Sequence, residues 1–123
     1  MGIISNSDRD DSIHIQSNRI EGGSYGIQLY GGGTNTSDQE NSLIIEGNHI
    51  SNVYSVGIYL AYQNAPIIRN NVIDLGNNSS TYGIYLYYVY DDARITKTKS
   101  VQTIKIHMEF MLTILMQAIQ AKL

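Results

Sequence analysis

Apolar and polar residues alternate in short groups along the chain up to about residue 90. Segments 13–15, 27–29, 58–60 and 84–86 each place a polar or tyrosine side chain between two aliphatic ones. This period of two predicts β-strands that bury one face. Turn-forming Gly, Asn and Ser residues, as in 76–80, separate the groups, and no helical periodicity lies between them. The pattern therefore predicts many short strands joined by turns.

The strand groups belong to an internal repeat. The pattern I-x-x-N-x-I recurs as IQSNRI, IEGNHI and IRNNVI, at 15–20, 45–50 and 68–73. A Gly-Ile pair follows each copy, within YGIQL, VGIYL and YGIYL, at 25–29, 56–60 and 82–86. A unit of two or three short strands cannot bury its apolar face alone, so successive units must stack on each other. The repeat therefore predicts an all-β solenoid.

This recurrence resembles the right-handed parallel β-helix repeats of the pectin-lyase-like superfamily, and the resemblance covers about residues 2–95. It implies a fragment of about three coils over residues 1–96, continued by neighbouring coils of a longer parent protein. It also implies an extracellular or cell-envelope location for that parent, with carbohydrate as the ligand class.

Two repeated residue types receive structural roles. The repeated asparagines are expected at corners of the coil, because Asn tolerates left-handed backbone geometry, bonds to nearby backbone and can form ladders along the axis. The repeated glycines are expected at positive φ before a strand. The residues concerned are Asn18, Asn48 and Asn71, and Gly26, Gly57 and Gly83.

The composition changes after residue 96. All eleven Gly residues lie at or before Gly83, and no Asn follows Asn78. Residues 105–120 hold three of the four Met residues and the only Phe. We therefore assign residues 97–123 to an off-pattern tail with two interpretations. It is either a further coil read out of frame, or a terminal cap with a helix over about 103–121, because caps are common in solenoids.

The genetic code supports an out-of-frame coil. Read from the third base of each codon, Met108-Glu109 specifies Gly whichever Glu codon is used. The same frame turns HMEF into Tyr or His, Gly, Ile or Val, and Tyr or His, which matches YGIY at 82–85. It turns Lys97-Thr98 into Asn or Asp, at the position where the repeat requires Asn. Loss of one base near the Lys97 codon would account for both matches.

The outward position two residues after each repeated glycine is the candidate ligand site. It holds Gln28, Tyr59 and Tyr85, and further tyrosines lie near its edge at Tyr30, Tyr62, Tyr87 and Tyr88. Strands stacked about 4.8 Å apart would align these residues in a flat aromatic strip. Sugar rings can pack their C–H faces against such rings, while turn Asn and Ser residues supply hydrogen bonds. The alternative is that the tyrosines only stabilise the sheet as cross-strand pairs.

Charge and composition exclude several other functions. The net charge is −3 with both signs scattered, and the absence of a basic stripe argues against nucleic-acid binding. Without Cys the chain has no thiolate metal site. The first residues lack the pattern of a signal peptide. The longest uncharged apolar run, 110–121, is too short to span a bilayer.

The ionisable residues do not suggest a metal or cofactor site. Acidic clusters at 7–11, 37–40 and 91–92 lie in predicted turns, where solvated acidic residues are common. His14 and His49 are expected at the surface, without a second ligand at metal-binding spacing. We therefore predict neither a metal ion nor a cofactor.

Catalytic signatures of β-helix enzymes are also missing. The resemblance implies an Asp-Pro-His motif in epimerases, but the only proline, Pro66, precedes Ile67. Lyases bring acidic and basic side chains together, whereas no outward acid is evident beside Arg69. The sequence therefore favours a non-catalytic, carbohydrate-binding segment. The alternatives are a fragment of a lyase, epimerase or glycosidase whose active coils lie elsewhere, and a structural spacer without a ligand.

Overall fold

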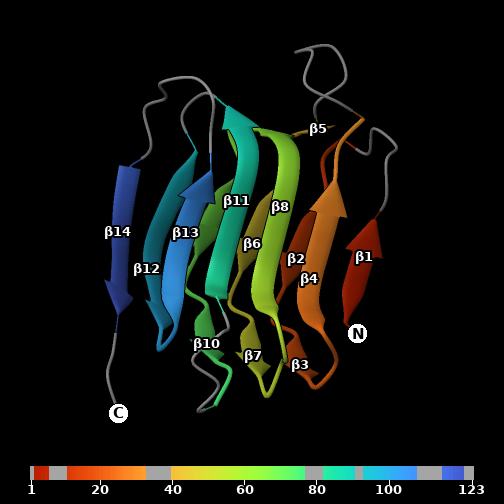
Figure 1. Cartoon of the computed structure of the whole chain (residues 1–123). Coiled ribbons are helices and arrows are strands. Elements are labelled where there is room, and N and C mark those ends of the chain that lie inside the picture. Colours follow the sequence, from red (N-terminus) through yellow and green to blue (C-terminus); the bar gives the residue numbers. More distant parts are fainter. Residues whose placement is uncertain are drawn as a thin grey trace.

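The structure is a computed structural model, and it describes residues 2–5, 11–32, 40–76, 82–90, 93–107 and 115–120. These residues form parallel strands that wind into a solenoid of about three turns, as Figure 1 shows. Sheet A has the order β1-β4-β8-β11-β13, with β5 beside β8, and sheet B has the order β2-β6-β9-β12-β10-β7-β3, with β14 beside β12. The strands of sheet A are β1 (Ile3–Ser5), β4 (Tyr25–Tyr30), β5 (Glu40–Asn41), β8 (Val56–Asn64), β11 (Tyr82–Tyr90) and β13 (Thr103–His107). Those of sheet B are β2 (His14–Gln16), β3 (Arg19–Glu21), β6 (Ile44–Glu46), β7 (His49–Ser51), β9 (Ile67–Arg69), β10 (Val72–Asp74), β12 (Arg94–Ser100) and β14 (Leu115–Gln120).

The predicted all-β solenoid is confirmed. Each complete turn contributes two short strands to sheet B and then one longer strand to sheet A, as in β2-β3-β4, β6-β7-β8 and β9-β10-β11. The two short strands of a turn coincide with the two ends of the I-x-x-N-x-I pattern. The Gly-Ile mark lies in the strand of sheet A. One sequence repeat is therefore one turn.

Aliphatic side chains stack in register between the two sheets. The stacks are Ile15–Ile45–Ile68–Ile95 and Ile20–Ile50–Ile73 in sheet B, and Ile27–Ile58–Ile84 and Leu29–Leu60–Leu86 in sheet A. All of these side chains are buried. Burial of each contributes about 1.5–3 kcal/mol, and most of that burial is against the adjacent turns. This is why the sequence repeats the same aliphatic residue at each level.

The asparagines were predicted to make the corners of the coil, but the structure places each corner one residue earlier. Left-handed backbone occurs one residue before each ladder position, at Ser17, Gly47, Asn70 and Lys97, with φ of 58°, 67°, 56° and 50°. The ladder asparagines that follow are not among the positive-φ residues. The residue before the asparagine therefore makes the corner, and the asparagine is free to direct its side chain along the axis.

The repeated glycines were expected at positive φ, and this expectation is wrong. A Cβ atom on Gly57 would lie 2.6 Å from the carbonyl oxygen of Gly83 and 2.8 Å from Cγ2 of Ile73. A Cβ atom on Gly26 would lie 2.6 Å from the carbonyl oxygen of Gly57. Glycine is therefore required by the close approach of neighbouring turns and not by backbone conformation.

The described part of the tail contains strands, so the helix expected over 103–121 is wrong there. Strand β12 runs across the expected boundary at residue 96 and pairs with β9 and β10, and β13 pairs with β11. Residues 108–114 and 121–123 lie outside the described part. The backbone pairing of β13 with the edge of β11 outweighs the helical propensity of the segment.

The tail follows the solenoid imperfectly. Ser100 pairs with Ile73, which places a serine in the aliphatic stack, and Thr98 occupies the ladder position after Asn71. The register of β13 against β11 shifts between Tyr82 and Ile84. In the part of the chain that the structure describes, no helix is long and apolar enough to cross a membrane.

Candidate functional site

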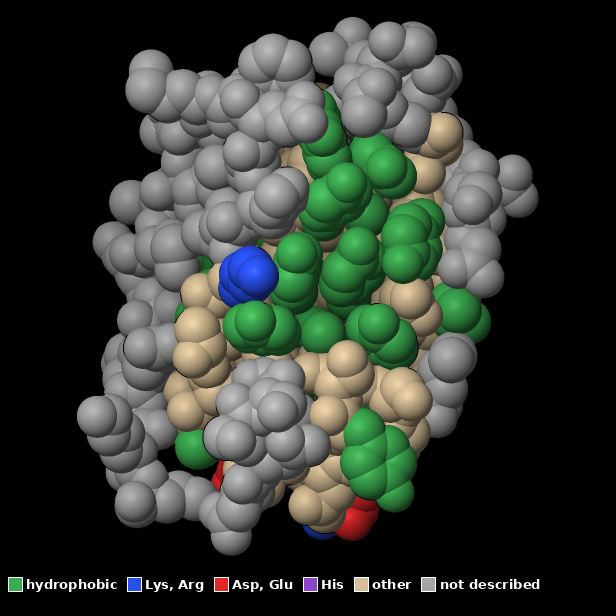
Figure 2. Space-filling model, viewed as in Figure 1, with side chains coloured by type: hydrophobic (Ala, Val, Ile, Leu, Met, Phe, Trp, Pro, Cys, Tyr) green, Lys and Arg blue, Asp and Glu red, His purple; other side chains and the backbone are tan. Residues whose placement is uncertain are grey.

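Tyrosines gather on the outer face of sheet A. Figure 2, in the orientation of Figure 1, shows a group of hydrophobic side chains over β4, β8 and β11, with a basic side chain at its border. We call this set the tyrosine surface, and every member is half-buried: Tyr25, Gln28, Tyr30, Tyr59, Tyr62, Tyr82, Tyr85, Tyr87 and Tyr88. The surface therefore combines ring packing with access to solvent.

The predicted outward column lies at the centre of this surface. Gln28, Tyr59 and Tyr85 are direct partners on β4, β8 and β11. The ring centroids of Tyr59 and Tyr85 are 5.4 Å apart with planes inclined by 32°, and the ring of Tyr30 lies 5.3 Å from that of Tyr59. The side-chain amide of Gln28 donates to the hydroxyl of Tyr30 at 3.3 Å. The structure thus brings four of the predicted residues together.

The other predicted residues, Tyr62, Tyr87 and Tyr88, form a second group. The rings of Tyr62 and Tyr88 stack 5.8 Å apart, and Tyr87 meets Tyr88 edge to face at 4.5 Å. Tyr62 and Tyr88 have positive φ angles of 57° and 50°, which is uncommon for bulky residues. Because both backbones turn in the same way on adjacent strands, their rings leave the sheet in parallel.

Sequence reasoning missed three residues of this region. Tyr25 lies 5.9 Å from Tyr59 at an interplanar angle of 77°, and Tyr82 lies 5.6 Å from Tyr85 at 84°. Strict alternation from the inward Ile27 would turn Tyr25 into the core, but Gly26 and Ile27 are both buried and interrupt the alternation. The third residue is Lys105 in the tail, whose Nζ lies 5.2 Å and 5.3 Å from the ring centroids of Tyr82 and Tyr85.

The centre of the tyrosine surface is uncharged at neutral pH. Burial raises the pKa of Tyr59 above its usual range, and the hydrogen bond with Tyr30 raises it further. The phenol therefore remains protonated and can donate a hydrogen bond. Lys105 places a positive charge at the β13 side of the surface.

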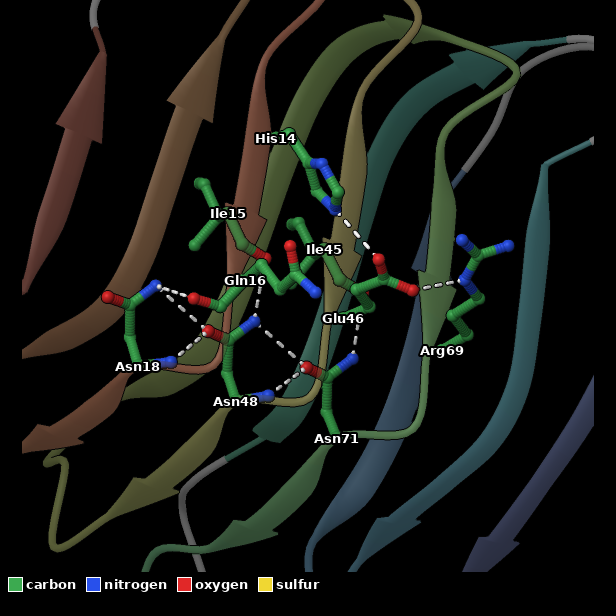
Figure 3. Close-up of polar contacts among 9 residues, drawn as sticks. All are labelled: His14, Ile15, Gln16, Asn18, Ile45, Glu46, Asn48, Arg69 and Asn71. Atoms are coloured by element: carbon green, nitrogen blue, oxygen red, sulfur yellow. Dashed lines mark hydrogen bonds and ion pairs between the residues drawn. The ribbon is translucent and has the colours of Figure 1, made fainter.

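The repeated asparagines form a ladder along the solenoid axis, shown in Figure 3. The backbone N–H and side-chain amide of Asn18 donate to Oδ1 of Asn48 at 2.9 Å and 3.1 Å. The same groups of Asn48 donate to Oδ1 of Asn71 at 3.0 Å and 3.1 Å. Asn71 reaches Oγ1 of Thr98 at 3.4 Å and 3.5 Å, so the ladder weakens at its last step.

The ladder amides have a structural role. Asn48 and Asn71 are 1% exposed, and their side-chain amides also donate to the carbonyl oxygens of Ile15 and Ile45 at 3.0 Å. Their hydrogen-bonding groups are therefore occupied within the solenoid. A second polar ladder at another corner links Asp11, Asn41 and Asn64, with Asn41 N–H donating to Asp11 at 2.9 Å and Asn64 donating to Asn41 at 2.8 Å.

An ionic cluster occupies the outer face of sheet B. The absence of an acid beside Arg69 was expected, and this expectation is wrong, because Glu46 pairs with Arg69 across β6 and β9. Oε2 of Glu46 accepts a hydrogen bond from Nε of Arg69 at 2.5 Å, and Oε1 of Glu46 accepts one from Nε2 of His14 at 2.8 Å (Figure 3). The hydrogen bond from Arg69, and then that from His14, lowers the pKa of Glu46 below its usual value.

The remaining candidates are surface residues or lie outside the described part. His49 is exposed on β7. Asp11 takes part in the second polar ladder, whereas residues 7–10, 37–39 and 91–92 of the acidic clusters are not among the described residues. The described residues contain no group of three or more His, Cys, Asp or Glu that could hold a metal ion.

Comparison with known proteins identifies the repeat region. A family model described as "Right handed beta helix region" matches residues 36–102, which is more than half of the 123 residues. No curated protein and no solved structure gives a significant match.

Proposed function

The chain belongs to the right-handed beta helix family, and from this premise we propose that it is a non-catalytic β-helix segment that binds carbohydrate through the tyrosine surface. The proposal includes a larger extracellular or cell-envelope protein as its setting. The observation that carries it is the register-aligned pair Tyr59 and Tyr85, with Tyr25 and Tyr82 turned nearly perpendicular to them.

Ring orientation supports a sugar as the ligand. Because half-buried rings occur in two nearly perpendicular orientations, the surface offers both ring faces and hydroxyl-bearing edges. A pyranose needs this combination, since its C–H face is apolar and its rim is polar. The amide of Gln28 supplies a donor beside the rings, and the tyrosine hydroxyls supply further polar groups.

Affinity electrophoresis through gels that contain neutral or acidic polysaccharides tests this proposal. We expect Tyr59→Ala combined with Tyr85→Ala to weaken retardation about tenfold or more, a change of about 1.4 kcal/mol in binding free energy. Tyr54→Ala is the matched control, because Tyr54 is 73% exposed and lies outside the tyrosine surface. Tyr59→Phe combined with Tyr85→Phe keeps the rings and separates stacking from hydrogen bonding.

Two results would overturn the proposal. One is that no polysaccharide retards the wild-type protein, which would leave the tyrosines with only their role as cross-strand pairs. The other is that Tyr54→Ala weakens retardation as much as the double variant. Melting curves of each variant show whether a loss of binding reflects a loss of folding.

A further inference from the structure

The solenoid concentrates positive charge on one turn. Residues 1–92 contain ten acidic and three basic residues, whereas residues 93–107 contain four basic and no acidic ones. Three of these four, Arg94, Lys97 and Lys99, lie on β12 of sheet B and are exposed. Half of the basic residues of the chain therefore lie in one short segment, and three of them share one strand.

Arg69 and Arg94 lie close together on the outer face of sheet B. Arg94 pairs with Ile67, and Arg69 pairs with Thr96, so the two arginines are diagonal neighbours on adjacent parallel strands. Strand separation and the rise over two residues place their Cα atoms about 8 Å apart. Arginine side chains are long enough to converge on one ligand across this distance, above the outward side chain of Thr96.

Arg69 is held in place by the ionic cluster. Only its Nε is bonded to Glu46, and Figure 3 shows its two terminal nitrogens directed away from that carboxylate. Its side chain is 42% exposed. Arg94 is exposed and makes no ion pair with any residue that the structure describes. One guanidinium group is therefore fixed in orientation, and the second one beside it has no ionic partner among the described residues.

We propose that Arg69, Arg94 and Thr96 form a binding site for a tetrahedral oxyanion, sulfate or phosphate, taken up free or as a sulfate ester on a polysaccharide. The planar guanidinium group matches two oxygens of such an anion at once. Fixing Arg69 in advance reduces the entropy lost on binding. Lys97 and Lys99 raise the positive potential around the site. The site is on the opposite sheet from the tyrosine surface and does not depend on the function proposed for that surface.

Titration with sodium sulfate and sodium phosphate at constant ionic strength, followed by amide chemical shifts, tests the site. We expect saturable shifts on β9 and β12, and an affinity about tenfold or more weaker in Arg69→Gln combined with Arg94→Gln. Arg19→Gln is the matched control, because Arg19 is exposed on β3 of the same sheet, and we expect it to change the affinity less than about twofold. Arg69→Lys combined with Arg94→Lys retains the positive charge but removes the planar guanidinium groups that can bind two oxygens at once. This variant is also expected to bind weakly.

Retention on dextran sulfate and on dextran distinguishes the two sources of the anion. Retention on dextran sulfate alone, lost in the double Gln variant, supports a sulfate ester. Saturable binding of the free ions without retention supports a free ion. The proposal is overturned if the wild-type protein binds neither free ions nor dextran sulfate. It is also overturned if Arg19→Gln matches the double Gln variant, or if the Lys variant binds as the wild type does, because diffuse charge would then explain the binding.

Discussion

At the residue scale, the nearest neighbours of a side chain are its own equivalents in the turns above and below. Gly57 lies between Gly26 and Gly83, and Ile45 lies between Ile15 and Ile68. A substitution is therefore constrained mainly by two residues that are distant in sequence. The same arrangement sets the ionisation of Glu46, whose two partners come from the turns on either side.

Replacing Gly57 by alanine is expected to destabilise the fold by about 2 kcal/mol, because the new Cβ atom overpacks the backbone of the next turn. The clash is with the carbonyl oxygen of Gly83, which cannot move without disturbing β11. Gly22→Ala is the comparison, since Gly22 has a φ of 82° with nothing within 4 Å of an added Cβ. That change is expected to cost only about 1 kcal/mol of conformational strain. Urea unfolding of both variants measures the difference, and an equal loss would contradict the steric explanation.

Replacing Glu46 by glutamine is expected to reduce stability at neutral pH but not at strongly acidic pH. The pKa of Glu46 is lowered in the folded state from its ordinary value of 4.5, through Arg69 first and His14 second. A lowered pKa stabilises the folded protein above pH 4.5, and this contribution disappears as the pH falls through the folded-state pKa. Unfolding midpoints of the wild type and variant should therefore converge below pH 4.5. A constant difference across that range would show that the charge of Glu46 is not involved, and Glu21→Gln on the same sheet is the control.

The outward column of Gln28, Tyr59 and Tyr85 was predictable because one residue position simply repeats in each turn. Tyr25 and Tyr82 were not predictable, since the glycine that follows each of them interrupts the alternation. The pair of Glu46 and Arg69 had a signal in the repeat, because aligning IEGNHI with IRNNVI places the two side by side. The proximity of Arg94 to Arg69 also had a signal in the repeat, because aligning position 98 with Asn71 places Arg94 opposite Ile67.

At the element scale, polar ladders help to hold neighbouring turns in register, the asparagine ladder beside the short strands of sheet B and a second ladder beside β5 and β8 of sheet A. In the asparagine ladder, each turn donates hydrogen bonds to the next one along the chain. In the second ladder, which begins at Asp11, each turn donates to the preceding one. Strands of three residues bury little apolar surface by themselves, so these side-chain bonds help to specify the pairing.

Replacing Thr98 by asparagine is expected to stabilise the fold by about 1 kcal/mol, the net contribution of a typical hydrogen bond. The bonds from Asn71 to Thr98 are 3.4 Å and 3.5 Å long, whereas the bonds between asparagines are 2.9–3.1 Å. An amide oxygen at position 98 would restore the shorter geometry. Thr96→Asn is the control, because it makes the same chemical change on the outer face of β12. Thermal unfolding should rank Thr98→Asn above the wild type, and a lower rank would show that the site cannot accommodate the amide.

The strands were predictable from local alternation and the repeat, but the tail was not. A segment rich in Met, Leu and Ile has helical propensity in isolation. The edge of β11 supplies backbone partners and an apolar face that a lone helix lacks, so Thr103–His107 pairs as a strand. Tertiary pairing therefore decides the conformation where propensity is ambiguous.

At the scale of the whole molecule, the two sheets carry different chemistry on their outer faces. Sheet A presents half-buried tyrosines, and sheet B presents the ionic cluster and the cations of β12. Because the faces lie on opposite sides of one core, substitutions on one should leave the other unchanged. The two proposed binding surfaces can therefore be tested independently.

The coding sequence is expected to continue the repeat in another frame after the codon of Lys97. The motivation is that Thr98 occupies a ladder position and the buried Ser100 an aliphatic position, and the shifted frame supplies Asn or Asp at the first and permits Ile or Val at the second. Sequencing the gene from codon 90 to well beyond codon 123 tests this expectation. Further N-x-I and Gly-Ile marks in the shifted frame would support it. A shifted frame that closes at once, with a stop codon directly after Leu123 in the given frame, would refute it.

The spacing of the repeated glycines, 31 and then 26 residues, shows that strand positions are conserved between turns while the connecting segments vary in length. Because the stacks and ladders fix the strands, a connecting segment can lengthen or change composition at little cost in free energy. The fold thus separates the part of the sequence that must be copied from the part that can diversify. A peptide grafted into the connection between β4 and β5 would be displayed at a defined height on the solenoid, which makes this chain a candidate display scaffold.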